Sequence, residues 1–157
     1  MSSVDVITMV AELTRDEGEV LKVYDDKTGN LLHAGMTIGG NPTIGVGRNL
    51  AGQGISVAEA SYLLTNDIQS ASAALEANLP WWENLDPVRQ RVMVNMCFNL
   101  GVAGLMTFHN FLAAMQAGNW QEAAAQMQQS AWWNEVGQRA VRLQYMVLNG
   151  AVQPGSV

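Results

Sequence analysis

The stretch Asp16–Gly47 reads DEGEVLKVYDDKTGNLLHAGMTIGGNPTIGVG, and it changes character three times. Glu17 closes an amphipathic helical pattern, and Gly18 is a typical residue to end that helix. LKVY then alternates as a short strand does, and DDKTGN has the composition of a tight turn. TIGVG, which includes Thr43, has the pattern of a second strand. The stretch therefore predicts a helix end followed by a small β-hairpin region.

Two acidic residues in this stretch stand where chemistry is possible. A carboxyl at a helix end, on Glu17, and another in the turn beyond one strand, on Asp26, can face each other across a cleft. Glycoside hydrolysis needs such a pair, because one carboxylic acid protonates the leaving oxygen while a carboxylate activates water or attacks the sugar. On composition alone, the alternative is an ordinary solvated acidic surface.

Composition restricts the class of protein. A chain of 157 residues predicts one domain or two small lobes, and 48% apolar residues suffice for a sizeable core. A net charge of −6 argues against nucleic acid as a partner. Cys97 is the single cysteine and is expected to be a buried small hydrophobe. His33 and His109 lie in unrelated segments without a second ligand at metal-binding spacing, so no metal site is predicted.

Charge and hydropathy are unevenly distributed. Seven of the fourteen acidic residues fall within the first 26 positions, whereas four of the six arginines follow residue 80. We therefore expect an acidic first lobe to dock on basic later helices. The N-terminus has neither a basic region nor a long apolar run, so no signal peptide and no membrane span are expected.

Helical signals organise the remaining chain. Ser3 is expected to cap a helix over 4–17, and Ser56 with Glu59 forms a capping-box pattern for a long helix over 56–79. Asp86-Pro87 should start a buried central helix that ends at Gly101. Further helices are expected after residue 107, after the caps Asn119 and Ser130, and before the Gly/Pro tail.

Four ordered segments carry a family resemblance. Asp26 follows Glu17 by nine positions and precedes Thr43 of TIGVG; the later segments are LDPVRQRVMVNMCFNLG, GNWQEAAAQM and SAWWNEVGQRAVR. Together they resemble the phage-type lysozymes, the endolysins, over most of residues 10–148. The resemblance implies an α+β, mostly α, two-lobed lysozyme-like fold in a single domain. Its parts would be a β-containing lobe at about 15–55, a connecting helix at 56–79, and a helical lobe at 80–150 packed with the helix 4–17.

The resemblance also implies a reaction: hydrolysis of the β-1,4 bond between N-acetylmuramic acid and N-acetylglucosamine in peptidoglycan. Glu17 would be the acid, Asp26 the base for water and Thr43 the orienting hydroxyl, with inversion at the anomeric carbon. The nine-position spacing favours Asp26 over its neighbour Asp25, although Thr43 is also consistent with an ordinary strand residue. No cofactor, no nucleic acid and no stable membrane association are implied, and a monomer is expected.

Other positions match the family outside the acid pair. Asn99 matches a polar position at the floor of the cleft, and Trp132 an aromatic position on its wall, although core packing explains Trp132 equally well. Arg139 and Arg142 match the residues that the family places beside Glu17 and the neighbouring Asp16 respectively.

The chain departs from the compact family pattern after the Asp turn. Thr43 follows Asp26 by 17 positions, so Leu31–Pro42 is an insertion, expected to be a mobile extension over the cleft mouth. Arg48 stands where compact members often carry a histidine. Two alternatives remain, a lytic transglycosylase and a catalytically inactive wall-binding module. Because no signal peptide is expected, the resemblance to endolysins implies that the protein stays in the host cytoplasm until a membrane lesion releases it to the cell wall.

Overall fold

The computed structural model describes residues 5–155, which divide into two compact units, residues 5–60 and residues 61–155. The elements form a mostly helical chain with one small antiparallel sheet, so the α+β class expected from the sequence is confirmed. The two units are described separately below. The single-domain organisation with a β-containing lobe, a connecting helix and a helical lobe stays a prediction.

The first unit begins with the helix α1, Val6–Glu17. Asp5 is its N-cap, accepting hydrogen bonds from the N–H of Thr8 at 3.1 Å and from the Thr8 hydroxyl at 2.7 Å. Gly18 ends the helix with a φ of +75°, as the sequence predicted. The expected cap Ser3 lies outside the described residues.

The apolar stripe of α1 is not covered within the described structure. None of the helix's described residues is buried, although its sequence is amphipathic. Val6, Val10 and Leu13, which lie on one face at helical spacing, are 66%, 59% and 46% exposed. No other described element of the first unit covers this apolar face.

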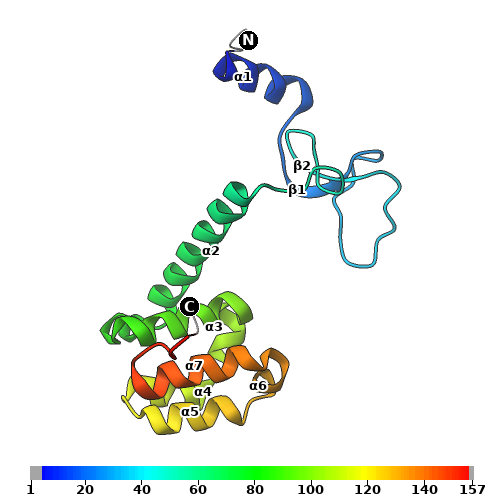
Figure 1. The fold of residues 1–157 in the computed structure, drawn as a ribbon. Coiled ribbons are helices and arrows are strands. Elements are labelled where there is room, and N and C mark those ends of the chain that lie inside the picture. The colour runs from blue at the N-terminus through cyan, green and yellow to red at the C-terminus, as the bar shows by residue number, and fades with distance from the viewer. Residues whose placement is uncertain (1–4, 156–157) are drawn as a thin grey trace. The chain divides into compact units, whose positions relative to one another are not determined.

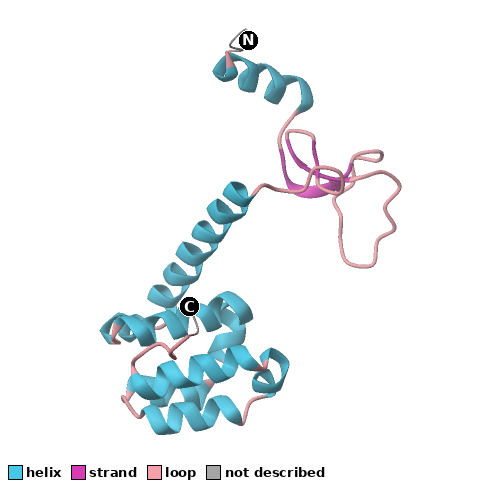
Figure 2. Cartoon of the chain, in the orientation of Figure 1, coloured by secondary structure: helices cyan, strands magenta, loops and turns pink. Residues whose placement is uncertain are grey.

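A three-stranded antiparallel sheet follows, in the order β1-β2-β3. Its strands are magenta in Figure 2. Its strands are β1, Val20–Asp25, β2, Pro42–Gly45, and β3, Arg48–Asn49. Tyr24 pairs with Thr43, and Asp25 with Pro42, while an irregularity separates them from the pair Val20–Gly45. The two predicted strands are confirmed, and β3 adds a short third.

The insertion Leu31–Pro42 is mostly exposed; it forms a loop after β1 and ends at Pro42, the first residue of β2. Leu31 forms a bridge with Tyr24, so the loop begins close to the sheet. No residue of the loop is buried, which agrees with the expectation that its Gly and Asn-Pro content does not build a core. Its mobility and its place over a cleft stay predictions.

The helix α2, Val57–Asn78, begins as the capping box predicted. The Ser56 hydroxyl accepts from the N–H of Glu59 at 3.2 Å, and the Glu59 carboxylate accepts from the N–H of Ser56 at 2.7 Å. Arg48 also pairs with Glu59 at 2.8 Å, which joins β3 to the start of this helix.

The second unit is a helical bundle around one apolar core (Figure 1). After α2 come a 3₁₀ turn, η1, and five α-helices, of which α5 and α7 lie side by side. The elements are η1 Pro80–Asn84, α3 Pro87–Met106, α4 His109–Gln116, α5 Trp120–Gln128, α6 Ala131–Val136 and α7 Gln138–Asn149. The expected caps Asn119 and Ser130 are both confirmed, each accepting a backbone N–H.

The central helix α3 carries much of the core, including Met93, Met96 and the thiol-bearing Cys97, as its nearly all-apolar sequence predicted. Asp86 caps it, accepting from two backbone N–H groups. The helix was expected to end at Gly101. Gly101 breaks it with a φ of +69°, but helical structure resumes beyond this kink and ends at Met106.

Arg89 fixes the end of α7 against the start of α3. Its guanidinium donates to the carbonyl of Val147 at 2.8 Å and to that of Leu148 at 3.3 Å. It also pairs with Asp86 at 2.6 Å and lies 4.0 Å from the ring centroid of Trp120. A largely buried cation thus satisfies two carbonyls at a helix C-terminus.

Within residues 5–155, no single helix has the length and hydropathy of a membrane span. The pair α3 and α4, bent by 108°, passes that test together by length and composition only.

Candidate functional site

Glu17 is the last residue of α1 and its side chain is exposed. A Cβ placed on Gly47 would lie 3.8 Å from Glu17 Oε2, so the carboxyl lies beside the turn between β2 and β3. The neighbouring Asp16 pairs with Arg15 at 2.8 Å, and both of these side chains are largely exposed.

Asp25, at the end of β1, has only 3% of its surface exposed. Its carboxylate accepts from the N–H of Lys27 at 3.0 Å and from the N–H of Gly39 at 2.8 Å. The Gly39 hydrogen bond is the main reason that the pKa of Asp25 lies below its ordinary value; burial opposes this shift. The arrangement makes Asp25 an anchor for the inserted loop.

Asp26 follows directly and, unlike Asp25, is exposed. Its two carboxylate oxygens each accept a hydrogen bond from Asn41, one from the backbone N–H at 2.7 Å and one from Nδ2 at 3.0 Å. These two bonds hold the pKa of Asp26 below its ordinary value, and the bond from the Asn41 backbone N–H has the larger effect. An ionised, oriented and accessible carboxylate is suited to accept a proton from water.

Thr43 lies on β2 and is 3% exposed. Its hydroxyl donates to the backbone carbonyl of Asn41 at 3.2 Å. The same carbonyl accepts the N–H of Asp26 at 3.1 Å. Asn41 therefore connects Asp26 and Thr43, which the sequence separates by the whole insertion.

Glu17 is not brought to this cluster. Its carboxyl lies beside Gly47, near the end of the β1–β2 ladder where Val20 pairs with Gly45. Asp26 follows the other end of the same ladder, where Asp25 pairs with Pro42. The first unit thus joins two of the three predicted catalytic residues.

The predicted substrate residues of the helical unit contact each other. Trp132 Nε1 donates to Asn99 Oδ1 at 2.6 Å. The Trp132 ring also meets Phe108 edge-on, with centroids 6.2 Å apart and planes at 88°. Because Trp132 is 3% exposed, its face is not available for a sugar to stack on in this conformation. Asn99 is exposed.

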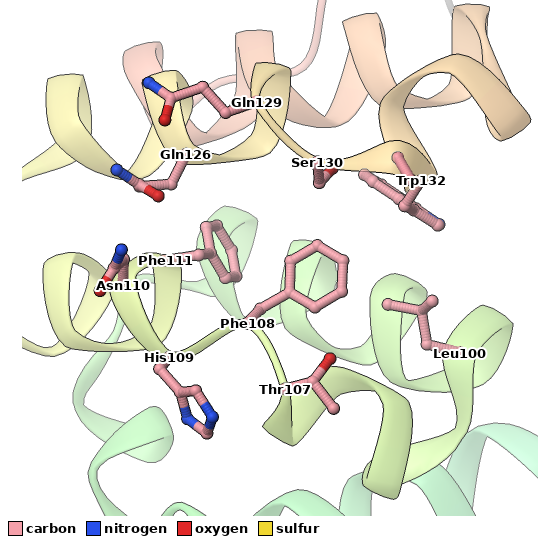
Figure 3. A pocket seen from close by; sticks show the side chains of 11 residues that line it. Leu100, Thr107, Phe108, His109, Asn110, Phe111, Gln126, Gln129, Ser130 and Trp132 are labelled. Carbon is pink, nitrogen blue, oxygen red and sulfur yellow. The ribbon is translucent and has the colours of Figure 1, made fainter.

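Trp132 forms part of the wall of a pocket of about 510 Å³ (Figure 3). Figure 3 shows Gln126 and Trp132 on one side, Asn110 on the other and the ring of Phe108 between them. Most of its lining residues carry amide, hydroxyl or aromatic groups, and two are aliphatic. The lining residues are Leu100, Thr107, Phe108, His109, Asn110, Phe111, Gln126, Gln129, Ser130, Ala131 and Trp132.

A second pocket, of about 660 Å³, is more apolar and includes Phe98 and the arginines Arg91 and Arg139. Arg139 donates to the side chain of Asn95 at 2.8 Å and to its backbone carbonyl at 3.1 Å. Arg142 makes no hydrogen bond or ion pair within residues 5–155 and lines a third, adjoining pocket. The expected pairing of Arg139 with Glu17, and of Arg142 with Asp16, stays a prediction.

Among residues 5–155, no group of three or more histidine, cysteine, aspartate or glutamate side chains is arranged to hold a metal ion.

Sequence reasoning missed Asn41. The sequence assigned no role to this residue within the insertion, because its two hydrogen bonds to Asp26 span 15 residues. An asparagine directly before a proline and two residues before Thr43 was the available signal.

The chain is similar in sequence to several known proteins. The pre-baseplate central spike protein Gp5 of Enterobacteria phage T4 is 30% identical over 164 residues, covering 94% of this chain but 28% of that protein. The probable T4-type lysozyme 1 of Dictyostelium discoideum is 29% identical over 62% of this chain and 59% of its own length. Probable T4-type lysozyme 2 of the same organism is 27% identical over 83% of this chain and 88% of its own length.

The family model described as phage lysozyme matches residues 14–148. This span contains the acid pair, Thr43, Asn99 and Trp132. The resemblance carried by the four ordered segments is thereby confirmed, and the chain belongs to the phage lysozyme family.

Proposed function

We propose that this protein hydrolyses the β-1,4 bond between N-acetylmuramic acid and N-acetylglucosamine in bacterial peptidoglycan, and so lyses the cell wall as an endolysin. The observation that carries the proposal is the family match over residues 14–148, which includes every proposed site residue. Two of the matched relatives are named as probable T4-type lysozymes. The chain covers only 28% of the spike protein, so what that whole protein does is not transferred.

In the proposed reaction Glu17 donates a proton to the glycosidic oxygen as its bond to the anomeric carbon breaks. Asp26 accepts a proton from a water molecule whose oxygen forms the new bond to that carbon, and Thr43 helps to orient this water. The exposure of Asp26, and the two hydrogen bonds from Asn41 that hold its carboxylate in one orientation, support the role of base. Asp25 is the less suitable base, since loop N–H groups occupy its buried carboxylate.

The proposed stereochemical outcome is inversion. An inverting pair of carboxyls stands about 6.5–9.5 Å apart so that a water fits between sugar and base, whereas a retaining pair stands about 5–5.5 Å apart. The support is the connection of Asp26 to Thr43 through Asn41, which keeps the proposed base and the proposed orienting hydroxyl close together. Glu17 and Asp26 must then reach the longer separation in the substrate complex, and the first product has the α configuration.

Asn99 is proposed to contact substrate from the helical unit, and Trp132 to position it. The exposed amide of Asn99 is available for hydrogen bonds, while Trp132 holds that amide through its indole N–H. The polar and aromatic wall of the 510 Å³ pocket suits a ligand rich in amide and hydroxyl groups. The burial of Trp132 agrees with core packing, the alternative that the sequence left open for this residue.

We also propose a single lysozyme-like domain in which helix 4–17 packs with residues 80–150. The exposed apolar face of α1 supports this, because such a stripe is stable when it is covered. Val10→Asp should then lower the melting temperature by several degrees, while Ala11→Asp, on the opposite face, should have little effect. Equal melting temperatures for the two variants would show that the apolar face of α1 is not buried in the folded protein.

The protein is further proposed to act as a monomer on peptidoglycan, to remain in the host cytoplasm until released to the wall, and to associate stably with neither membrane nor nucleic acid. These proposals rest on the endolysin resemblance and on the net charge of −6.

The decisive experiment digests purified peptidoglycan and identifies the new chain ends by mass. Hydrolysis adds a water to each cleaved bond. A lytic transglycosylase instead leaves an anhydro-sugar that is one water lighter, and its reaction would not need Asp26. A catalytically inactive binding module releases no fragments at all.

Glu17→Gln tests the acid, because an amide cannot protonate the leaving oxygen. We expect a loss of turnover of about 10²–10⁴-fold with the fold retained. Glu19→Gln is the matched control, since Glu19 is an exposed acid two residues away and should be dispensable. Near-normal turnover in Glu17→Gln would refute the assignment.

A further inference from the structure

We infer that Asn41, which ends the inserted loop, is the positioning residue of this site: it orients the proposed base Asp26 and connects it to Thr43. The inference rests on the proposed function, because it concerns the water-activating half of the same reaction. It gives the insertion a chemical role, whereas the sequence suggested only a mobile extension.

Asn41 makes four hydrogen bonds that converge on the two residues. Its N–H donates to Asp26 Oδ1 at 2.7 Å, and its Nδ2 donates to Asp26 Oδ2 at 3.0 Å. Its carbonyl accepts from the N–H of Asp26 at 3.1 Å and from Thr43 Oγ1 at 3.2 Å. One residue therefore holds both oxygens of the carboxylate and directs the hydroxyl of Thr43.

The residue type fits the task. Asp26 Oδ1 already accepts the backbone N–H of Asn41, so a donor that reaches Oδ2 from the same residue must stand on a short side chain. The amide of asparagine supplies such a donor. Pro42 follows, and a residue before proline is restricted towards extended backbone, which limits the directions that the Asn41 N–H can take. Pro42 also begins β2 opposite Asp25, so the sheet itself holds this position.

The hydrogen bonds have a chemical consequence for Asp26. A donor on each oxygen favours the ionised form and fixes the plane of the carboxylate. Each oxygen keeps further lone-pair capacity, so a water can still donate to it. Asn41 thus orients the exposed carboxylate of Asp26 and leaves it able to accept a hydrogen bond from water.

The test separates the side chain of Asn41 from its backbone. Asn41→Ala removes only the Nδ2 bond, while Asn41→Asp places a second carboxylate against Asp26. Asn30→Ala is the control, because the Asn30 side chain is exposed and makes no hydrogen bond within residues 5–155. The measurements are kcat and KM on peptidoglycan across pH, and titration of the Asp26 carboxyl by ¹³C NMR.

In Asn41→Ala we expect kcat to fall roughly tenfold to a hundredfold with KM nearly unchanged. The acidic limb of the kcat/KM profile and the NMR titration of Asp26 should both move to higher pH, and further still in Asn41→Asp. A merely structural role would lower stability without moving either titration. Asn30→Ala should match the wild type in every measurement.

Wild-type kcat and an unmoved Asp26 titration in Asn41→Ala, in a protein that Glu17→Gln inactivates, would overturn the inference and leave the proposed function intact. Full activity in Glu17→Gln, or no cleavage by the wild type, would instead refute the proposed function. The two failures are therefore distinguishable.

Discussion

The carboxylate of Asp25 accepts a 2.8 Å hydrogen bond from the backbone N–H of Gly39, 14 residues further along the chain. This contact joins the end of β1 to the far end of the inserted loop. Asp26 makes the next connection, to Asn41. Two consecutive aspartates thus hold the loop close to β2, one from a buried position and one from an exposed position.

The first prediction concerns pH. The folded pKa values of Asp25 and Asp26 both lie below the ordinary value of 3.8, chiefly because of the backbone N–H groups of Gly39 and Asn41 respectively. The stability that these carboxylates add is therefore fully present above 3.8 and is lost as pH falls through the lower folded values. The protection factor of the Gly39 amide, which compares its exchange rate with that of an unfolded chain at the same pH, should be high near neutral pH and fall in acid. Asp25→Asn should weaken that protection at neutral pH, and unchanged protection would contradict the anchoring role.

The second prediction concerns the paired glycines of the loop. A Cβ on Gly40 would overlap Asp26 Oδ1 and lie 2.7 Å from Asp25 Oδ1, so Gly40→Ala must displace these carboxylates or the loop that carries the glycine. A Cβ on Gly39 would lie 3.5 Å from Asp25 Oδ2, an ordinary contact. We expect Gly40→Ala to reduce kcat by more than about tenfold and Gly39→Ala to retain most activity. Equal kinetics for the two variants would show that the site tolerates a shift of this loop.

The third prediction compares two buried tryptophans. Trp132 Nε1 donates to Asn99, whereas the buried Trp82 Nε1 has no acceptor within the described part of the chain. Both Trp→Phe substitutions remove comparable ring volume, but only Trp132→Phe removes a hydrogen bond. Trp132→Phe should therefore reduce the free energy of unfolding by about 1 kcal/mol more than Trp82→Phe does, measured in urea. A larger loss in Trp82→Phe would contradict this.

The fourth prediction concerns the arginine at the end of α7. Arg89→Met retains apolar packing but leaves the carbonyls of Val147 and Leu148 without their partner and Asp86 without its ion pair. We expect a loss of about 3 kcal/mol in the free energy of unfolding. Arg142→Met is the control, since this exposed arginine should contribute less than about 1 kcal/mol. Equal losses would assign Arg89 no special part in the core.

Local sequence signals predicted most of the elements. The capping box at Ser56, the Asp86-Pro87 start and the caps Asn119 and Ser130 all function as expected, because a cap depends on atoms within a few residues. The alternation of LKVY and TIGVG likewise predicted the two main strands. Gly101 was interpreted as a helix end, yet the chain resumes its helix there, because apolar packing of Leu105 continues beyond the kink.

The sequence by itself determined most helix ends, the two main strands, the family and the candidate catalytic residues Glu17, Asp26 and Thr43, because each depends on residues close together or in a recognisable order. Only the tertiary structure showed which of Asp25 and Asp26 has the accessible carboxylate. It also placed Trp132 in a buried position against Phe108, and Asn41 in contact with Asp26. The physical reason is range: burial and hydrogen bonds across 14 or 15 residues depend on how the chain returns on itself. No local periodicity records that return.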